Sequence, residues 1–244
     1  MIQWLAVCFA ALAMALCHPV YATTAKKPLW DVNKDIPEQA MQYLPVLRAQ
    51  VNDVMPGFHA PEYFAALVEH ESGCPGIKSM CWNPKARLKS SREEGAGLPQ
   101  ITRAYKEDGT LRFDALTEAR KLDPRGLNEL RWDTVYQRPD LQLRVMVVMT
   151  RQNWNRASKL TQDPRYQLKL TDLSYNAGFG RVLNDMRACS NTAGCNAQAW
   201  EDHVEQTCTA SKKPIYGNRS ACDISRHHVH DVVTTRSPKY KGKV

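Results

Sequence analysis

The chain has 244 residues, of which 43% are hydrophobic, and a formal net charge of +8 at pH 7. This apolar content is sufficient for a sizeable core and excludes an intrinsically disordered chain, and the length suits one domain of ordinary size. The positive charge favours attraction to acidic polymers such as a cell wall or an anionic membrane surface. Nucleic acid is not an expected partner, because the Lys and Arg residues are scattered without interleaved aromatic residues.

The first 22 residues have the features of a secretory signal. Residues 1–22 contain no Asp, Glu, Lys or Arg and end with Val20 and Ala22 at the two positions that a signal peptidase reads. Their apolar run is shorter than the roughly 20 residues of a membrane-spanning helix. We therefore expect a cleaved signal peptide, export to the periplasm or the exterior, and no stable membrane span afterwards. An uncleaved anchor is one alternative, and a lipoprotein signal at Cys17 is disfavoured by the bulky Leu16.

The next segment predicts a flexible lead and then helix. Residues 23–34 are mostly polar. The apolar spacing over residues 37–55 is helical, and Pro45 is expected to kink this helix or divide it in two.

The stretch 64–102 is the most informative part of the sequence. Phe64, Leu67, Val68 and Glu71 are spaced so that they share one face of a helix. A carboxylate that ends an apolar stripe is costly to desolvate unless it keeps its proton or finds a partner. A carboxyl group that keeps its proton near neutral pH is what glycosidic bond cleavage requires as a general acid. A helix-capping or salt-bridged Glu71 is the alternative interpretation.

The rest of the chain predicts a mainly helical domain. Glycine and proline residues between 72 and 97 predict loops or short strands over a cleft. Helices are expected at residues 100–106, 114–122, 139–160, 164–177, 181–186 and 218–233. Residues 191–213 show no clear period and are interpreted as an insertion, and the basic tail 237–244 is expected to fray.

The cysteines predict disulfide bonds. Removal of the signal leaves an even set, which in an exported protein favours disulfides: Cys74, Cys81, Cys189, Cys195, Cys208 and Cys222. Proximity in the sequence favours pairing each of these with its neighbour in that order. A zinc site is the competing interpretation, but the spacings are not those of paired CxxC knuckles.

Three segments together resemble the soluble lytic transglycosylase family. They are Glu71-Ser72, the turn Ser91 to Gln100 with Gly97-Leu98-Pro99-Gln100, and Ser174-Tyr175-Asn176-Ala177-Gly178. The resemblance covers about residues 58–186. Glu94 and Gly95 stand where the family usually has Gly and Ala, Pro99 replaces Met or Phe, and Ser174 replaces Ala.

The resemblance implies a fold, a reaction and a set of site residues. It implies a mainly α, lysozyme-like (α+β) single domain with short strands or loops over an active-site cleft. Glu71 would be the single acid/base that cleaves the MurNAc–GlcNAc β-1,4 bond of peptidoglycan with formation of 1,6-anhydroMurNAc, without metal or cofactor. The substrate-binding residues implied are Ser91, Gln100, Tyr175 and Asn176. The alternative for Tyr175 and Asn176 is that they form a helix end packed under the cleft. The alternative for Ser91 is that it supports its turn, and for Gln100 that it begins a helix.

Other acidic and histidine residues leave two further possibilities open. Glu93 or Glu94 would act as a second carboxylate in a hydrolytic mechanism, as in goose-type lysozymes, whereas solvated charge is the simpler interpretation. His227, His228 and His230 have a spacing that suits metal ligands but is also common on a helix surface, and no metal is expected.

The sequence thus predicts a domain organisation and a set of competing functions. The expected parts are a signal peptide (1–22), an N-terminal lead with helices (23–57), a lysozyme-like transglycosylase domain (58–236) with a cysteine-containing insertion at about 187–222, and a basic tail (237–244). A hydrolytic muramidase and a non-catalytic wall-binding module are the alternatives to a transglycosylase. The expected partner is the peptidoglycan glycan strand, and the resemblance permits a conjugation, secretion, pilus or phage assembly that docks on the insertion.

Overall fold

A computed structural model of the chain describes residues 30–74, 76 and 79–244, and residues 31–244 form one compact unit. The unit is mainly helical with a small antiparallel sheet, as the sequence predicts. The expected signal peptide lies outside the described residues. Within the described part, the structure contains no helix long and apolar enough to cross a membrane.

Two helices form the N-terminal part of this unit. Helix α2 (Ala40–Val54) continues through Pro45 as one helix, so the expected division into two short helices is not observed. Its buried residues, including Leu44, Leu47 and Val51, pack in the same core as helix α3 (Glu62–Glu71). This apolar contact holds the helix together where proline removes one backbone hydrogen bond.

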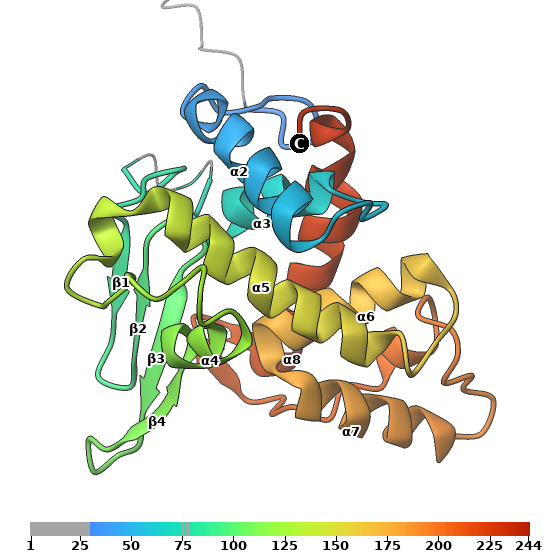
Figure 1. Ribbon diagram of the computed structural model, residues 1–244. Helices are drawn as coiled ribbons and strands as arrows, with labels where there is room; N and C mark the ends of the chain where they lie inside the picture. Colours follow the sequence, from blue (N-terminus) through green and yellow to red (C-terminus); the bar gives the residue numbers. More distant parts are fainter. Residues whose placement is uncertain (1–29, 75, 77–78) are drawn as a thin grey trace, which may run out of the picture. The chain divides into compact units, whose positions relative to one another are not determined.

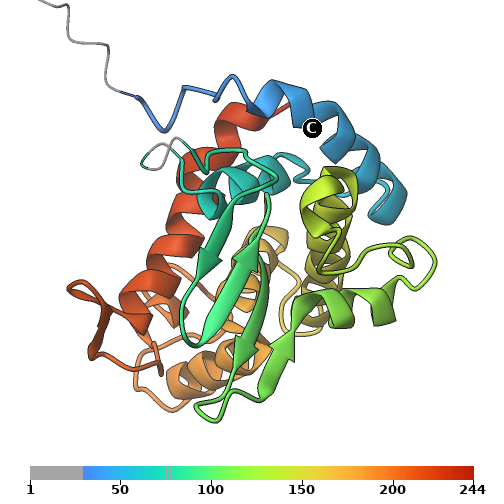
Figure 2. The ribbon, with the colours of Figure 1, turned by 90° about the vertical axis from the view of Figure 1, so that its left-hand side faces the viewer.

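The sheet consists of four consecutive antiparallel strands, β1 (Arg87–Lys89), β2 (Glu93–Ala96), β3 (Ile101–Tyr105) and β4 (Leu111–Asp114). The helix expected over residues 100–106 is wrong, because this segment is strand β3. β-branched and aromatic side chains, Ile101, Thr102 and Tyr105, favour the extended form once β2 and β4 pair on both sides. Figure 2 shows this sheet facing the viewer.

The turn between β2 and β3 depends on glycine. Gly97 has a φ of 71°, and a Cβ there would lie 2.2 Å from Oε1 of Gln142. No side chain fits, so the close approach requires glycine.

Helix α5 (Pro139–Ala157) runs through the middle of the unit, with the sheet on one side and helices α6 (Pro164–Ala177) and α8 (Ala221–Val229) on the other (Figure 1). The predicted helices at 139–160 and 164–177 are confirmed. Helix α4 (Ala115–Leu122) is also confirmed, with Asp114 as its N-cap. Helix α7 (Phe179–Ser190) is longer than predicted, and a short 3₁₀ helix, η1 (Val135–Gln137), precedes α5.

The predicted insertion has little regular secondary structure and is cross-linked by disulfide bonds. It contains the 3₁₀ helix η2 (Val204–Gln206) and the hairpin of β5 (Pro214–Tyr216) and β6 (Arg219–Ser220). All three predicted pairings are confirmed: Cys74–Cys81, Cys189–Cys195 and Cys208–Cys222. Such bonds are typical of proteins that fold in an oxidising compartment.

The end of the chain is packed rather than frayed. After α8 the chain continues as a π-helical segment, η3 (His230–Arg236), and a 3₁₀ helix, η4 (Ser237–Tyr240). Tyr240 is fully buried in the main core. The expectation of a frayed tail is therefore wrong for these residues, because buried contacts outweigh the basic composition that suggested disorder.

Candidate active site

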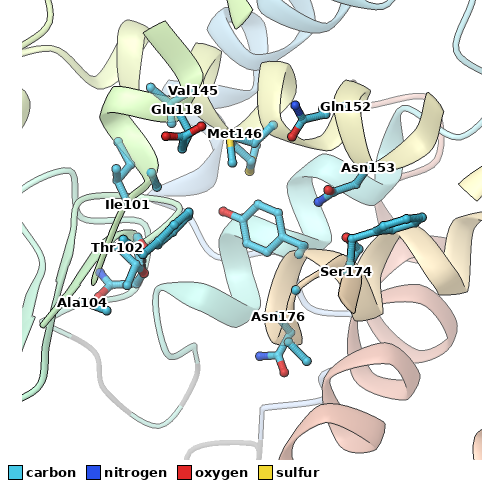
Figure 3. A pocket seen from close by; sticks show the side chains of 18 of the residues that line it. Ile101, Thr102, Ala104, Glu118, Val145, Met146, Gln152, Asn153, Ser174 and Asn176 are labelled. Carbon is cyan, nitrogen blue, oxygen red and sulfur yellow. Dashed lines mark hydrogen bonds between the residues drawn. The ribbon is translucent and has the colours of Figure 1, made fainter. Parts of the chain in front are cut away.

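A cavity of about 700 Å³ lies between the sheet and helices α5 and α6. Figure 3 shows Ile101, Thr102 and Ala104 of β3 on one side of it and Gln152, Asn153, Ser174 and Asn176 of the two helices on the other. Three of the four predicted substrate-binding residues, Gln100, Tyr175 and Asn176, line this cavity although they come from distant parts of the sequence. A cavity of this size, lined by both polar and apolar side chains, is large enough for a small ligand or part of a polymer.

Glu71 is the last residue of α3, at the point where the buried helix emerges. The residues from Tyr63 to Glu69 are fully buried, whereas the Glu71 side chain retains 19% of its exposure. Glu71 itself is not among the cavity-lining residues. Its Oε1 atom is hydrogen-bonded to His228, and Oε2 has no hydrogen-bond partner among the described residues. One carboxyl oxygen is therefore held and the other is available.

A buried histidine joins Glu71 to a second carboxylate. Nε2 of His228 lies 3.0 Å from Oε1 of Glu71, and Nδ1 lies 2.7 Å from Oδ2 of Asp172. The hydroxyl of Tyr63 donates to the other oxygen of Asp172 at 3.0 Å. His228 is 2% exposed and Asp172 is fully buried. The result is a continuous hydrogen-bonded chain from the core of α6 to the end of α3.

The imidazole of His228 is positively charged at neutral pH. Burial alone would lower its pKa, but the carboxylate of Asp172, and then that of Glu71, outweigh burial and raise the pKa to about 10. Both ring nitrogens therefore carry protons, and each donates to one carboxylate.

Tyr175 connects Glu71 with the cavity. Its hydroxyl donates to the carbonyl oxygen of Pro99 at 3.0 Å, and its ring lines the cavity. Burial, and then the nearby charges of Glu71 and Asp172, raise the pKa of Tyr175 well above its usual value. The phenol therefore stays protonated and lies within the electrostatic reach of the Glu71 carboxylate.

Gln100 lines the cavity and carries an unsatisfied acceptor that is buried against Gly95. Its Nε2 donates to the carbonyl of Gly97 at 2.9 Å, whereas its Oε1 is buried and has no partner among the described residues. The Oγ atom of Ser174, another cavity residue, is also buried without a partner among the described residues. Because buried polar atoms are nearly always hydrogen-bonded, these two atoms beside the cavity are exceptions, although neither is exposed on its surface.

The glycine that departs from the family pattern accommodates this glutamine. A Cβ at Gly95 would lie 2.5 Å from Oε1 of Gln100. An alanine at this position would push the Gln100 amide away.

Glu93 and Glu94 lie on opposite faces of the sheet, because successive strand residues alternate. Glu93 pairs with Ala104 in register and lines the cavity. Glu94 is 3% exposed, and its two oxygens are held by Arg87 at 2.7 Å and by Arg103 at 2.8 Å. Burial would raise the pKa of Glu94, but the two guanidinium groups outweigh it and lower that pKa. The structure therefore brings only Glu93 to the cavity.

Ser91 is the predicted site residue that the structure does not bring to the others. It is exposed in the turn between β1 and β2 and is not among the cavity-lining residues. Ser72, by contrast, is fully buried, and its Oγ accepts from the backbone N–H of Trp82 at 2.9 Å. Ser72 thereby holds the loop closed by Cys74–Cys81 against the end of α3.

A second buried network ties the same end of α3 to the C-terminal segment. Glu69 is fully buried and is contacted by Arg236 at 2.6 Å, by Lys239 at 2.8 Å and by the Tyr240 hydroxyl. Arg236 also binds Asp231 at 2.5 Å. The network holds η3 and η4 on α3 and so fixes the helix that carries His228.

The three histidines weighed as metal ligands separate in the structure. His228 is buried against Glu71, whereas His227 and His230 are exposed. Among the residues that the structure describes, no three His, Cys, Asp or Glu side chains are grouped to hold a metal ion.

Asp172 is a site residue that the sequence interpretation missed, and His228 was considered only as a metal ligand. Two signals pointed to them. His228 lies next to Val229, on the side of its helix that carries Cys222, and Asp172 is the one acidic residue of helix α6, next to Leu173. An acidic and a basic side chain beside apolar positions of two helices are candidates for a buried pair.

None of the protein-family models, curated proteins and solved structures compared with this chain matches it.

Proposed function

We propose that this chain is a peptidoglycan lytic transglycosylase with a lysozyme-like fold. The observation that carries the proposal is the setting of Glu71. Its carboxyl group has one oxygen anchored on a buried imidazole and one without a partner among the described residues, and it lies near Tyr175, which lines the cavity. A partly exposed carboxyl in this setting suits a residue that gives and takes a proton.

The cavity lining supports a saccharide carrying acetamido groups. The amide side chains of Gln152, Asn153 and Asn176 line the cavity, and each can both donate to and accept from an acetamido group.

The proposed reaction needs one carboxyl group and no water. Glu71 gives its proton to the oxygen that links MurNAc to GlcNAc, and the bond from C1 of MurNAc to that oxygen breaks. The C6 hydroxyl of the same MurNAc attacks C1, and its proton returns to Glu71. The product is a 1,6-anhydro ring, and the tethered hydroxyl replaces a positioned water and the second carboxylate.

Two carboxylates that line the cavity, Glu93 and Glu118, support a hydrolytic muramidase as the second candidate. In that reaction one of them would activate a water molecule opposite Glu71. A wall-binding module without activity is the third candidate, and the proton-exchanging setting of Glu71 speaks against it.

Mass spectrometry of digested peptidoglycan tests the proposal. The wild type is expected to release fragments with 1,6-anhydroMurNAc ends, and Glu71→Gln to lose activity by about 10²-fold or more while keeping its fold. Glu93→Gln and Glu118→Gln are the matched controls and should keep both the rate and the anhydro ends. Reducing ends that disappear in either control variant would establish hydrolysis instead. Undiminished turnover by Glu71→Gln would refute the role of Glu71.

A further inference from the structure

We propose that His228, fixed by Asp172, is the positioning residue of Glu71: it holds Oε1 so that Oε2 meets the substrate, and it stabilises the carboxylate left after proton donation. This inference rests on the proposed function, because it assigns a role within that reaction.

The geometry leaves the imidazole one orientation. Asp172 receives a hydrogen bond from His228 on one oxygen and from Tyr63 on the other, at 2.7 and 3.0 Å. Since Asp172 and Tyr63 are fully buried, neither can turn away. The ring of His70 packs edge-on against His228, with ring centroids 4.4 Å apart. The Nε2–H bond is therefore aimed at Glu71 before any substrate arrives.

The charge on His228 acts on one stage of the reaction. In the protonated form that gives its proton to the substrate, the Glu71 carboxyl is neutral and gains little from a neighbouring cation. After donation it is an anion, and the imidazolium hydrogen bond becomes charge-assisted and stronger. An interaction that strengthens as the reaction proceeds lowers the barrier, whereas one that is equal in both states does not. Asp172 keeps the imidazole charged by compensating it from the other side.

Other titratable groups around His228 are accounted for by contacts of their own. On α3, His70 binds Asp231 at 2.6 Å. On α6, the Tyr175 hydroxyl binds the Pro99 carbonyl. Titratable groups from three further directions face the imidazole or its partners. Helix α3 contributes Tyr63, His70 and Glu71, and helix α6 contributes Asp172 and Tyr175. His227 and Asp231 are close to His228 along the C-terminal segment, and Arg219 of β6 acts on His227. Only Asp172 and Glu71 hydrogen-bond to the ring among the described residues.

The first experiment measures kcat, KM and the pH profile of peptidoglycan cleavage for the wild type, His228→Gln and Asp172→Asn. His230→Gln is the matched control, since His230 is exposed and does not contact Glu71. We expect kcat to fall about 10- to 100-fold in the first two variants with KM little changed, the range of one charge-assisted hydrogen bond. The fall in kcat that accompanies loss of the His228 proton near pH 10 should be absent from the profile of His228→Gln.

The second experiment measures the protonation of His228 directly and does not depend on enzyme activity. Its ¹⁵N imidazole resonances should titrate near pH 10 in the wild type and at lower pH in Glu71→Gln and Asp172→Asn. This arm remains decisive if His228→Gln does not fold. Titration of the wild-type ring near its ordinary pKa of 6.5 would overturn the inference.

The outcomes separate the two proposals. A wild type that cleaves no peptidoglycan contradicts the proposed function, and with it the catalytic role of His228. An active wild type whose kcat and pH profile survive His228→Gln contradicts the positioning role alone.

Discussion

Nε2 of His228 lies 3.0 Å from Oε1 of Glu71, although 157 residues separate the two side chains in the sequence. A parallel contact joins the neighbouring His70 to Asp231, whose carboxylate also binds Arg236. Successive residues at the end of α3 are thus bound to successive turns of the C-terminal segment. The position of the candidate acid depends on a part of the chain that follows it by more than half the length of the molecule.

The ion pair at His228 predicts how stability varies with pH. The pKa of His228 is raised from 6.5 to about 10 in the folded state, so folding favours the protonated ring. This contribution is fully present below pH 6.5 and is lost as the pH rises to about 10. The free energy of unfolding should fall across this window by up to about 1 kcal/mol per pH unit relative to His228→Gln. Urea unfolding of both proteins at several pH values measures the difference, and parallel curves would contradict the prediction.

The acidic residues of β2 predict opposite results for neighbouring positions. Glu94→Gln removes the charge that Arg87 and Arg103 share, and should destabilise the fold by about 1–3 kcal/mol. Glu93→Gln changes an exposed side chain and should alter stability by less than about 0.5 kcal/mol. Thermal unfolding compares the two variants. Equal stabilities would mean that the arginine clamp contributes nothing.

The buried carboxylate of Glu69 predicts a large effect far from the cavity. Glu69→Gln leaves Arg236 and Lys239 without their shared anion, and should cost about 3–5 kcal/mol. Glu38→Gln, at an exposed position, is the control. Hydrogen exchange should show early opening of η3 and η4 in the Glu69 variant. Retained protection of these segments would show that packing of Tyr240 is sufficient to hold them.

Tyr175, which lines the cavity, has a matched control in Tyr136, which does not. Tyr175→Phe removes the donor to the Pro99 carbonyl and should cost about 1 kcal/mol of stability and about tenfold in turnover. The buried hydroxyl of Tyr136 has no partner among the described residues, so Tyr136→Phe should lower neither stability nor turnover. Urea unfolding and initial cleavage rates test both variants. A similar loss in each would indicate a general packing effect.

Local signals in the sequence were reliable where short-range physics dominates. Helices α5 and α6 begin at Pro139 and Pro164, where the sequence predicts their starts, and α6 ends at Ala177 as predicted. Sequence proximity was enough to pair the six cysteines. The strand at residues 101–105 was mistaken for a helix, because only its pairing with β2 and β4 decides its form.

The candidate site shows the same division. The sequence by itself singled out Glu71 and, through the family resemblance, the cavity residues Gln100, Tyr175 and Asn176. Only the tertiary structure placed Ser91 at an exposed turn, turned Glu94 away from the cavity and brought His228 and Asp172 to Glu71. The physical reason is the distance along the chain over which each interaction acts. Periodicity, caps and turns depend on residues a few positions apart, whereas the partner of a buried charge is determined by helices that meet only when the core packs.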